Sequence, residues 1–437
     1  MGDSMSTLKV DTINTSDGTG NITVSRPLSG SGASLTNLPA ANLTGTLPAI
    51  SATNLTNIPA ANITGTLPAI SGASLTNLPA GGDTRNFILD GDFTQWPEGD
   101  KTSVANVSYT SALFKYVKSG GEIVVNSLQT ADAPTVGESS HASKYCLHID
   151  VTTAESAVAA GDFAKVQYHV TGSDFAFIHQ QEITISFWHK HTKTGIYGCS
   201  LTNGAYDRSY VFEYTQTTTN TWEKVTKTIT LDSSGTWLLT EAGVGLILAF
   251  TMFSGSTYHA TADAWGAGDK LTTSNQVAGG DNAANNFKLS QVGLYLGSSA
   301  PNFLGEPISS IISQIAYYFQ TSYPYSHGLY PGGAHMNGMV GDLSTGIPFN
   351  TAWYCIHSVS FQPMMRKSPT IVTYDRAGAA GKVTRYSSSG GGSANGIVPA
   401  IDSNGATGFR AYLGIGGSPV SYPIYGFHMG YTADARH

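Results

Sequence analysis

Alternating apolar and polar positions recur in the middle of the chain and predict an antiparallel β-sandwich. β-Branched or aromatic residues alternate with polar ones in these runs, and Gly, Asn, Asp and Ser interrupt them at intervals. The runs span residues 122–125, 164–170, 182–188, 209–214 and 223–230. Two longer apolar runs, at 244–253 and 287–296, complete enough strands for a jelly roll.

A helix is predicted directly after these strands. Pro307 suits the first turn of a helix, because proline lacks the N–H that would remain unpaired there. Four isoleucines follow at the spacing of one helix face: Ile308, Ile311, Ile312 and Ile315. We therefore expect a short amphipathic helix that connects two β-modules.

Residues 353–361 and 370–374 predict two further strands, joined by a turn that contains Pro363. Glycine clusters at 390–392 and 416–417 predict exposed loops. The expected fold class is therefore mainly β, with a jelly-roll sandwich, a short helix and a C-terminal β-rich module.

The stretch 27–82 repeats with a period of 20 residues and contains no Asp, Glu, Lys, Arg or His. Segment 41–50 recurs as 61–70, and the prolines alternate at spacings of 9 and 11 residues. One copy cannot bury its own Leu and Ile, because proline excludes a long helix and an internal strand. Lateral association of identical chains would cover them, so we expect an oligomeric shaft. The alternative is a flexible low-complexity linker.

These patterns divide the chain into five expected parts. Residues 1–26 form an N-terminal attachment segment, and 27–82 form the shaft. The jelly roll spans 83–304, the connecting helix 305–322, and a C-terminal tip domain 323–437.

The composition excludes several classes of function. Only 12% of the 437 residues are charged, against about 25% in an ordinary domain. The net charge of -7 and the lack of a basic block argue against nucleic acid. No apolar run approaches the roughly 20 residues of a membrane span, so we expect no membrane insertion.

The widely spaced Cys146, Cys199 and Cys355 predict buried free thiols, and no cofactor is expected.

Several segments together resemble phage tail-fibre proteins, especially those of marine-type phages, with modules related to carbohydrate-binding jelly rolls. The resemblance covers roughly the first 320 residues. It rests on segments 6–13, 86–96, 185–188, 193–195, 220–224, 289–297 and 315–319, together with the shaft repeats. It implies a homotrimer on the virion tail, assembled in the host cytoplasm and joined to other tail proteins at its N-terminus.

Two places in the sequence bear on metal binding. Carbohydrate-binding jelly rolls often hold a structural calcium between carboxylates of the first and last strands, but Thr94 and Ser290-Gln291 occupy those positions here. Asp90 and Asp92 could supply part of such a site. His189 and His191 alternate on a strand, and three copies at a threefold axis could bind a metal, as in some fibre tips. We expect no metal, with this histidine pair as the weak alternative.

Aromatic residues in loops are the candidate ligand contacts, because sugar rings stack on Trp and Tyr. Trp265 lies in a glycine-flanked loop. The tip candidates, chosen by loop context alone, are Tyr325, Tyr330, Arg366 and Tyr386. Trp188 and Trp222 are expected in the core.

The resulting interpretation is a non-enzymatic adhesion protein that binds a host surface glycan or surface protein, with three weak sites acting together. One alternative is a tailspike-type glycan depolymerase, which needs two nearby carboxylates such as Asp207 and Glu213. The other alternative is a purely structural fibre in which the jelly roll is a spacer.

Overall fold

The computed structural model describes residues 84–241, 243–323, 339–344, 347–349, 352–387, 393–415 and 425–437. All of them belong to one compact unit, Thr76–His437. The expected attachment segment 1–26 and shaft 27–82 lie outside these ranges. Within the described ranges, no helix has the length and apolar character to cross a membrane.

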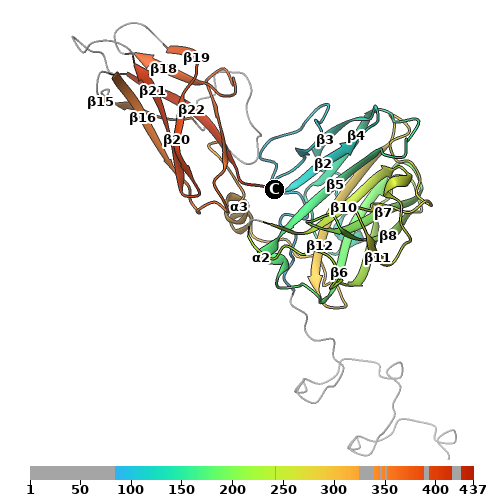
Figure 1. Ribbon diagram of the computed structural model, residues 1–437. Helices are drawn as coiled ribbons and strands as arrows, with labels where there is room; N and C mark the ends of the chain where they lie inside the picture. Colours follow the sequence, from blue (N-terminus) through green and yellow to red (C-terminus); the bar gives the residue numbers. More distant parts are fainter. Residues whose placement is uncertain are drawn as a thin grey trace, which may run out of the picture. The chain divides into compact units, whose positions relative to one another are not determined.

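Two antiparallel sheets form the sandwich that the alternating runs predict (Figure 1). The larger sheet has the order β1-β2-β5-β10-β7-β8-β11, and the smaller has the order β3-β4-β12-β6-β9. The larger contains β1 Ser108–Tyr109, β2 Phe114–Ser119, β5 Phe163–Thr171, β7 Gly195–Asn203, β8 Arg208–Gln216, β10 Val244–Ser254 and β11 Ala264–Ala267. The smaller contains β3 Val124–Thr130, β4 Cys146–Thr153, β6 Glu182–His191, β9 Glu223–Thr230 and β12 Asn286–Leu296. Strands distant in sequence pair in both sheets, as in a jelly roll.

Aromatic side chains from both sheets meet in the core. The ring of Phe187 on β6 lies 4.9 Å from that of Phe250 on β10, and 5.3 Å from that of Tyr214 on β8. Both phenylalanines are fully buried, and a fully buried side chain of this size contributes roughly 1.5–3 kcal/mol. The predicted thiols Cys146, Cys199 and Cys355 are free and buried, as expected.

The sequence patterns missed five sandwich strands: the short β1 and β11, and the longer β2, β4 and β7. Leu147, Ile149 and Val151 on β4 do alternate and are buried, so that signal was present. β7 is covered on both faces: a Cβ on its Gly198 would lie 2.6 Å from the Thr272 side chain. A strand buried on both faces does not alternate, so periodicity cannot reveal it.

The segment before the first strand lies against the last sandwich strand. Asn86 Nδ2 donates to the Val292 carbonyl oxygen at 3.1 Å, and Asn86 Oδ1 accepts from the Leu294 N–H at 2.9 Å. At Gly91, a Cβ would lie 2.0 Å from the same Val292 oxygen. Glycine is therefore required at position 91 for this close approach.

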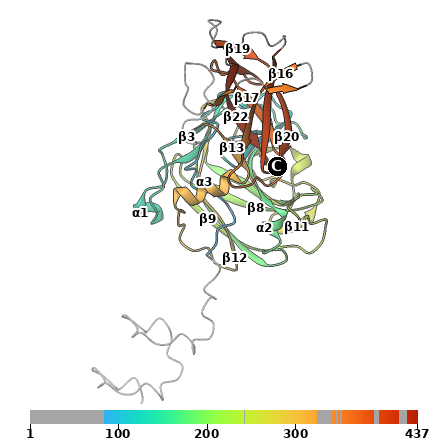
Figure 2. The same ribbon diagram turned by 90° about the vertical axis from the view of Figure 1, so that its left-hand side faces the viewer.

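The predicted helix is confirmed as α3, Ile308–Ala316, which Figure 2 shows lengthwise. Ile311 and Ile315 are buried against Ala112 and Leu113 of the sandwich. Ile308 is 59% exposed, because the helix meets the sandwich only beyond its first turn. The predicted apolar face is therefore wrong at that position. The other helices are α1 Val136–Ser139, α2 Gly172–Phe175 and a 3₁₀ turn at Ser256–Tyr258.

The C-terminal module is built around one strand, β22, that pairs with β13, β14, β17 and β18. A separate sheet has the order β15-β16-β21-β20. The strands are β13 Phe319–Thr321, β14 Val340–Ser344, β15 Ile347–Phe349, β16 Ala352–Ser360, β17 Thr370–Tyr374, β18 Val383–Ser387, β19 Ser393–Ile397, β20 Ala400–Gly405, β21 Gly408–Ile415 and β22 Tyr425–Asp434. The two predicted strands, β16 and β17, exist but belong to different sheets.

Candidate functional site

Two adjoining cavities lie where the segment 84–92 meets the chain that leads into α3. Their volumes are about 490 and 410 Å³, within the usual range for small-ligand sites. Four residues line both cavities: Arg85, Asn86, Leu89 and Glu306. We therefore treat the two as one site and call it the α3 groove.

Two buried aspartates lie in the floor of the groove. Asp90 Oδ1 accepts from the Thr94 N–H at 2.8 Å and hydroxyl at 2.6 Å, and Oδ2 accepts from the Gln95 N–H at 2.9 Å. Burial raises the pKa of Asp90 to about 7, against the opposing effect of these hydrogen bonds. Asp92 Oδ2 lies 3.4 Å from His141 Nε2, and burial raises the pKa of Asp92 as well, against the effect of His141. Asp90 thus holds the turn that precedes β1.

Three further carboxylates line the walls. Glu306 Oε2 accepts from the Ser310 hydroxyl at 3.0 Å, and its other oxygen has no partner among the described residues. Asp174 accepts from the Thr171 hydroxyl at 2.9 Å, and Glu241 accepts from the Ser173 hydroxyl. These groups keep part of their acceptor capacity for a ligand.

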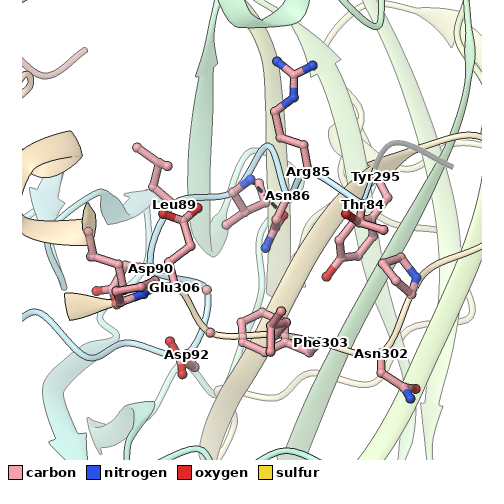
Figure 3. Close-up of a pocket in the computed structure, with 17 residues that line it drawn as sticks. Thr84, Arg85, Asn86, Leu89, Asp90, Asp92, Tyr295, Asn302, Phe303 and Glu306 are labelled. Carbon is pink, nitrogen blue, oxygen red and sulfur yellow. Dashed lines mark hydrogen bonds between the residues drawn. The ribbon is translucent and has the colours of Figure 1, made fainter. Parts of the chain in front are cut away.

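Among the described residues that line the groove, Arg85 is the one cation. Its guanidinium lies over the rings of Phe87 and Phe177, at 5.1 and 5.3 Å. Figure 3 shows that the Arg85 side chain points away from Asp92. Glu306, Asp174 and Glu241 alone outnumber the one guanidinium, so the groove disfavours an anionic ligand.

Aromatic rings complete the walls. Tyr317 and Tyr318 are half-buried, and their rings meet edge to face with centroids 5.3 Å apart. Burial and the neighbouring Glu241 raise the pKa of Tyr317, so its hydroxyl stays protonated. Phe303 lies across the first cavity and packs edge-on against His141 at 5.0 Å. Figure 3 shows Phe303 and Glu306 bordering this cavity.

The calcium site of carbohydrate-binding jelly rolls, whose usual carboxylates are missing from this sequence, does not fit these residues. Both oxygens of Asp90 already accept protein hydrogen bonds, and Asp92 faces His141. Gln291 presents its Nε2 donor to the Ser139 hydroxyl at 2.8 Å. Across the described ranges, no group of three or more His, Cys, Asp or Glu could hold a metal ion.

The histidine pair lies inside the sandwich, so its proposed role at a threefold axis is wrong. His189 and His191 share the inward face of β6 with Phe187 and are 0% and 2% exposed. His191 stacks on Tyr197 at 3.7 Å, and His189 Nδ1 lies 3.1 Å from Gln216 Oε1. Burial lowers the pKa of His189 to about 4. Alternate residues of a strand point to the same face, so positions 187, 189 and 191 of the sequence already indicated that both histidines share a face with Phe187.

The sequence-predicted ligand residues do not come together. Trp265 is half-buried on β11 and donates from Nε1 to the Thr230 carbonyl at 2.8 Å. Tyr386 is half-buried on β18, 4.4 Å from the His428 ring, and Arg376 donates to its hydroxyl. A ligand role for Trp265 or Tyr386 stays a prediction. Tyr325 and Tyr330 lie outside the described residues.

Arg366 is a structural residue rather than an exposed tip residue. It is 8% exposed, and its Nη2 donates to the Ala435 carbonyl at 2.9 Å. Its Nη1 donates to the Glu241 carbonyl. Its donors therefore attach the end of the C-terminal module to a loop of the sandwich.

Two other expectations concern strand placement. Trp188 points to the outer face of β6, opposite to Phe187, and is only half-buried, so its predicted core position is wrong. Trp222 is 7% exposed, just before β9. Asp207 directly precedes β8 and Glu213 lies within it, six residues further along, which is roughly 20 Å at about 3.3 Å per residue. Paired glycosidase carboxylates need about 5–9.5 Å, so these two cannot form that pair.

Sequence reasoning named Asp90 and Asp92 of the groove, but only as possible parts of a calcium site, and it missed the other groove residues. Tyr317 and Tyr318 are a conspicuous pair directly after an amphipathic helix, which is a usable signal. No local pattern distinguishes Asp174, Glu241 or Glu306 from other surface acids, because the groove exists only where distant segments meet.

Comparisons with known proteins yield structural likeness only: the chain matches no protein-family model and no curated protein. It is similar to the enzymatically active domain of bacteriophage CBA120 tailspike protein 4, at 13% identity and a TM-score of 0.25, covering 45% of this chain and 21% of that chain. It is also similar to the N-terminal CBM22-1–CBM22-2 tandem domain of Paenibacillus barcinonensis Xyn10C, at 10% identity and 0.25, covering 82% and 92%. A third is the family 11 carbohydrate-binding module of Lic26A-Cel5E from Clostridium thermocellum, at 11% identity and 0.25, covering 46% and 96%. TM-scores this low carry no weight for function, which is argued below from the chain's own residues.

Proposed function

We propose that this chain is an adhesion protein that binds a neutral, hydroxyl-rich glycan in the α3 groove. The observation that carries the proposal is the combination of three wall carboxylates, Asp174, Glu241 and Glu306, with half-buried tyrosine rings around one groove. Carboxylates accept charge-assisted hydrogen bonds from sugar hydroxyls, and the rings cover the apolar C–H faces. The single cation makes the groove a poor site for acidic sugars.

The wider setting is also a proposal, supported by the sequence resemblance to phage tail fibres. The chain forms a homotrimer on the virion tail after assembly in the host cytoplasm, and it joins other tail proteins through its N-terminal segment. The glycan, or alternatively a surface protein, belongs to the host cell. The three weak sites of one trimer then act together. Once one site is bound, the effective concentration of the ligand at the other two is high, which raises the overall affinity.

We further propose that binding occurs without cleavage. In support, the carboxylate pair considered from the sequence is separated along β8, and the oxygens of Asp90 are held by backbone N–H groups that position it in a turn. Incubation of the full chain with host polysaccharide should produce no new reducing ends. Their appearance would establish the depolymerase alternative instead.

The binding proposal is tested on a glycan array with the full chain and its Glu306→Gln variant. Removing this charge should weaken binding to neutral glycans by about tenfold, the worth of a hydrogen bond to a charged group. The matched control is Tyr206→Ala, an exposed side chain in the turn between β7 and β8, which should bind as the wild type does. An array that stays blank for the wild type would favour the spacer alternative.

The assembly proposal has its own measurement. Light scattering should give three times the 45.8 kDa chain mass. A monomer at micromolar concentration would overturn the trimer while leaving the groove untouched.

A further inference from the structure

The segment that leads into the sandwich passes beside the α3 groove. Thr84 and Arg85 are exposed, and both line the first cavity of the groove. Gly82, the last residue of the expected shaft, is two residues before Thr84 in the sequence. Because consecutive Cα atoms are about 3.8 Å apart, Thr84 lies within roughly 8 Å of that residue in any conformation. The surface around Thr84 is therefore the part of the compact unit that adjoins the shaft in the chain.

Large apolar side chains are exposed on this surface. Leu304 is 83% exposed and lines the same cavity as Thr84. Ile308, four residues further along at the start of α3, is also exposed. Phe177 is 63% exposed, and its ring lies beside Arg85, 5.3 Å from the guanidinium carbon. We call these three side chains the Leu304 patch. Exposed apolar side chains gathered in one place mark a contact surface for another molecule.

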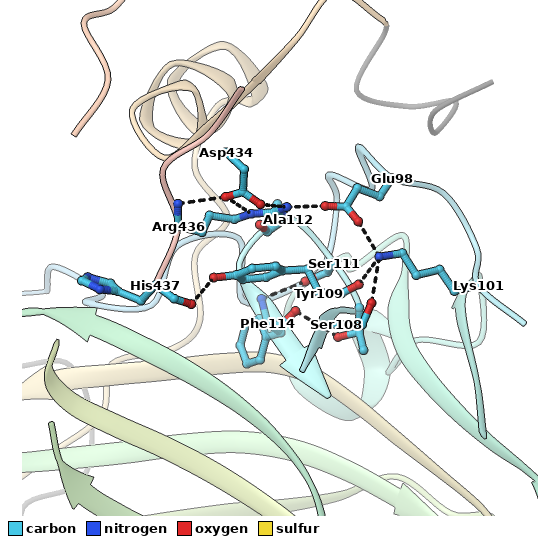
Figure 4. A network of polar contacts seen from close by, with 11 residues as sticks. Glu98, Lys101, Ser108, Tyr109, Ser111, Ala112, Phe114, Asp434, Arg436 and His437 are labelled. Carbon is cyan, nitrogen blue, oxygen red and sulfur yellow. Dashed lines mark hydrogen bonds and ion pairs between the residues drawn. The ribbon is translucent and has the colours of Figure 1, made fainter. Parts of the chain in front are cut away.

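The patch is a fixed surface, because the module beyond α3 is anchored to the sandwich. Arg436 lies between the rings of Tyr109 and Phe319, with its guanidinium carbon 3.6 and 4.1 Å from their centroids. Its Nη2 donates to Asp434 Oδ2 at 2.7 Å and to Glu98 (Figure 4). This anchor at the junction of the two modules holds both ends of the connection that contains α3. A preorganised surface of this kind loses little entropy when a partner binds.

Lateral association of the proposed shafts indicates which molecule covers the patch. Packed elements lie on the order of 10 Å apart, so the Thr84 residues of neighbouring copies would come within roughly 25 Å of each other. A compact unit of this length has a radius of gyration of about 20 Å. Two such units can be attached that closely only if their surfaces around Thr84 face one another. The partner that this geometry favours is a second copy of the chain.

We propose that neighbouring copies of this chain cover the Leu304 patch, with Leu304 and Ile308 of three protomers meeting around the threefold axis. The inference rests on the proposed trimer and assigns its contact to particular side chains. The apolar rows expected in the shaft then continue into the compact unit, where they exclude water in the same way.

This contact has a consequence for the α3 groove. A copy seated on Leu304 borders the first cavity, which Phe303 and Glu306 also line (Figure 3). Tyr317 and Tyr318 lie beyond the other end of α3, and nine residues at about 1.5 Å each separate the two ends by roughly 13 Å. The second cavity, which both tyrosines line, therefore stays open to a glycan.

The test is thiol crosslinking of the full-length Leu304→Cys variant with a short bifunctional maleimide. The native Cys146, Cys199 and Cys355 are buried, so they do not react in the folded protein. The matched control is Val398→Cys, at a 65% exposed position between β19 and β20, at the end of the C-terminal module away from α3 (Figure 1). Leu304→Cys should give about tenfold more covalent dimer than this control, because thiols within one trimer are at a high effective concentration.

Two results would overturn the proposal, and they differ in what they leave standing. If light scattering gives a trimer but Leu304→Cys crosslinks no better than Val398→Cys, the patch is not the contact and the trimer stands. A monomer at micromolar concentration removes both the contact and the trimer. Neutral-glycan binding by the wild type is scored separately on the array, so failure of the glycan proposal is distinguishable from either result.

Discussion

Arg436 stacks on Tyr109 at 3.6 Å and so joins the last strand of the chain to the first hairpin of the sandwich. Arg436→Lys should destabilise the protein by roughly 3 kcal/mol, because an ammonium cannot bond Glu98 and Asp434 while lying flat between two rings. Urea unfolding measures this change. Arg410→Lys is the matched control, since Arg410 pairs with Asp402 at the surface, and its midpoint should not move. Equal midpoints for both variants would show that the anchor contributes nothing.

Gly91→Ala should destabilise the sandwich by about 1–3 kcal/mol, the usual cost of forcing extra atoms into a packed site. The added Cβ would lie 2.0 Å from the Val292 carbonyl oxygen, which belongs to backbone and cannot rotate away. Gly266→Ala is the control, because nothing lies within 4 Å of its Cβ position. Thermal unfolding of the two variants compares them directly. A Gly91→Ala variant as stable as Gly266→Ala contradicts the close approach.

Acid should destabilise the sandwich through His189. Burial lowers its pKa from 6.5 to about 4 in the folded state, so its contribution is present above pH 6.5 and is lost as the pH falls through 4. The loss amounts to roughly 3 kcal/mol at about 1.4 kcal/mol per pKa unit. His189→Leu should therefore show a shallower fall in unfolding free energy between pH 6.5 and 4. The difference in unfolding free energy between the two proteins at pH 7 serves as the reference. Parallel pH profiles would rule out His189 as a cause of the acid destabilisation.

Tyr317 should contribute to glycan binding through its ring rather than its hydroxyl. Tyr317→Ala should lose about tenfold in affinity for neutral glycans, in line with roughly 0.5–1.5 kcal/mol or more for an aromatic contact. Tyr317→Phe keeps the ring and should stay within about twofold of the wild type. The measurement is calorimetry with a glycan that is positive on the array. Equal loss in both variants would assign the effect to the hydroxyl.

Local patterns were sufficient for most sandwich strands and for α3. The alternation in 182–188 predicted β6, and the isoleucine spacing predicted the helix that buries Ile311 and Ile315. Both patterns depend on residues within one element. They can therefore be recognised without knowing which other element packs against it. β7 and β22 escaped because strands buried on both faces, or central in a sheet, do not alternate.

The sequence by itself determined most sandwich strands and α3, because side-chain periodicity is a local property of the backbone. Only the tertiary structure decided what surrounds each side chain. It placed His189 in the core, buried Arg366 and Arg436 at the junction, and brought Glu306 beside Arg85 to line the α3 groove. The burial and the charged partners of these side chains come from other segments of the chain, and no spacing within one segment records them.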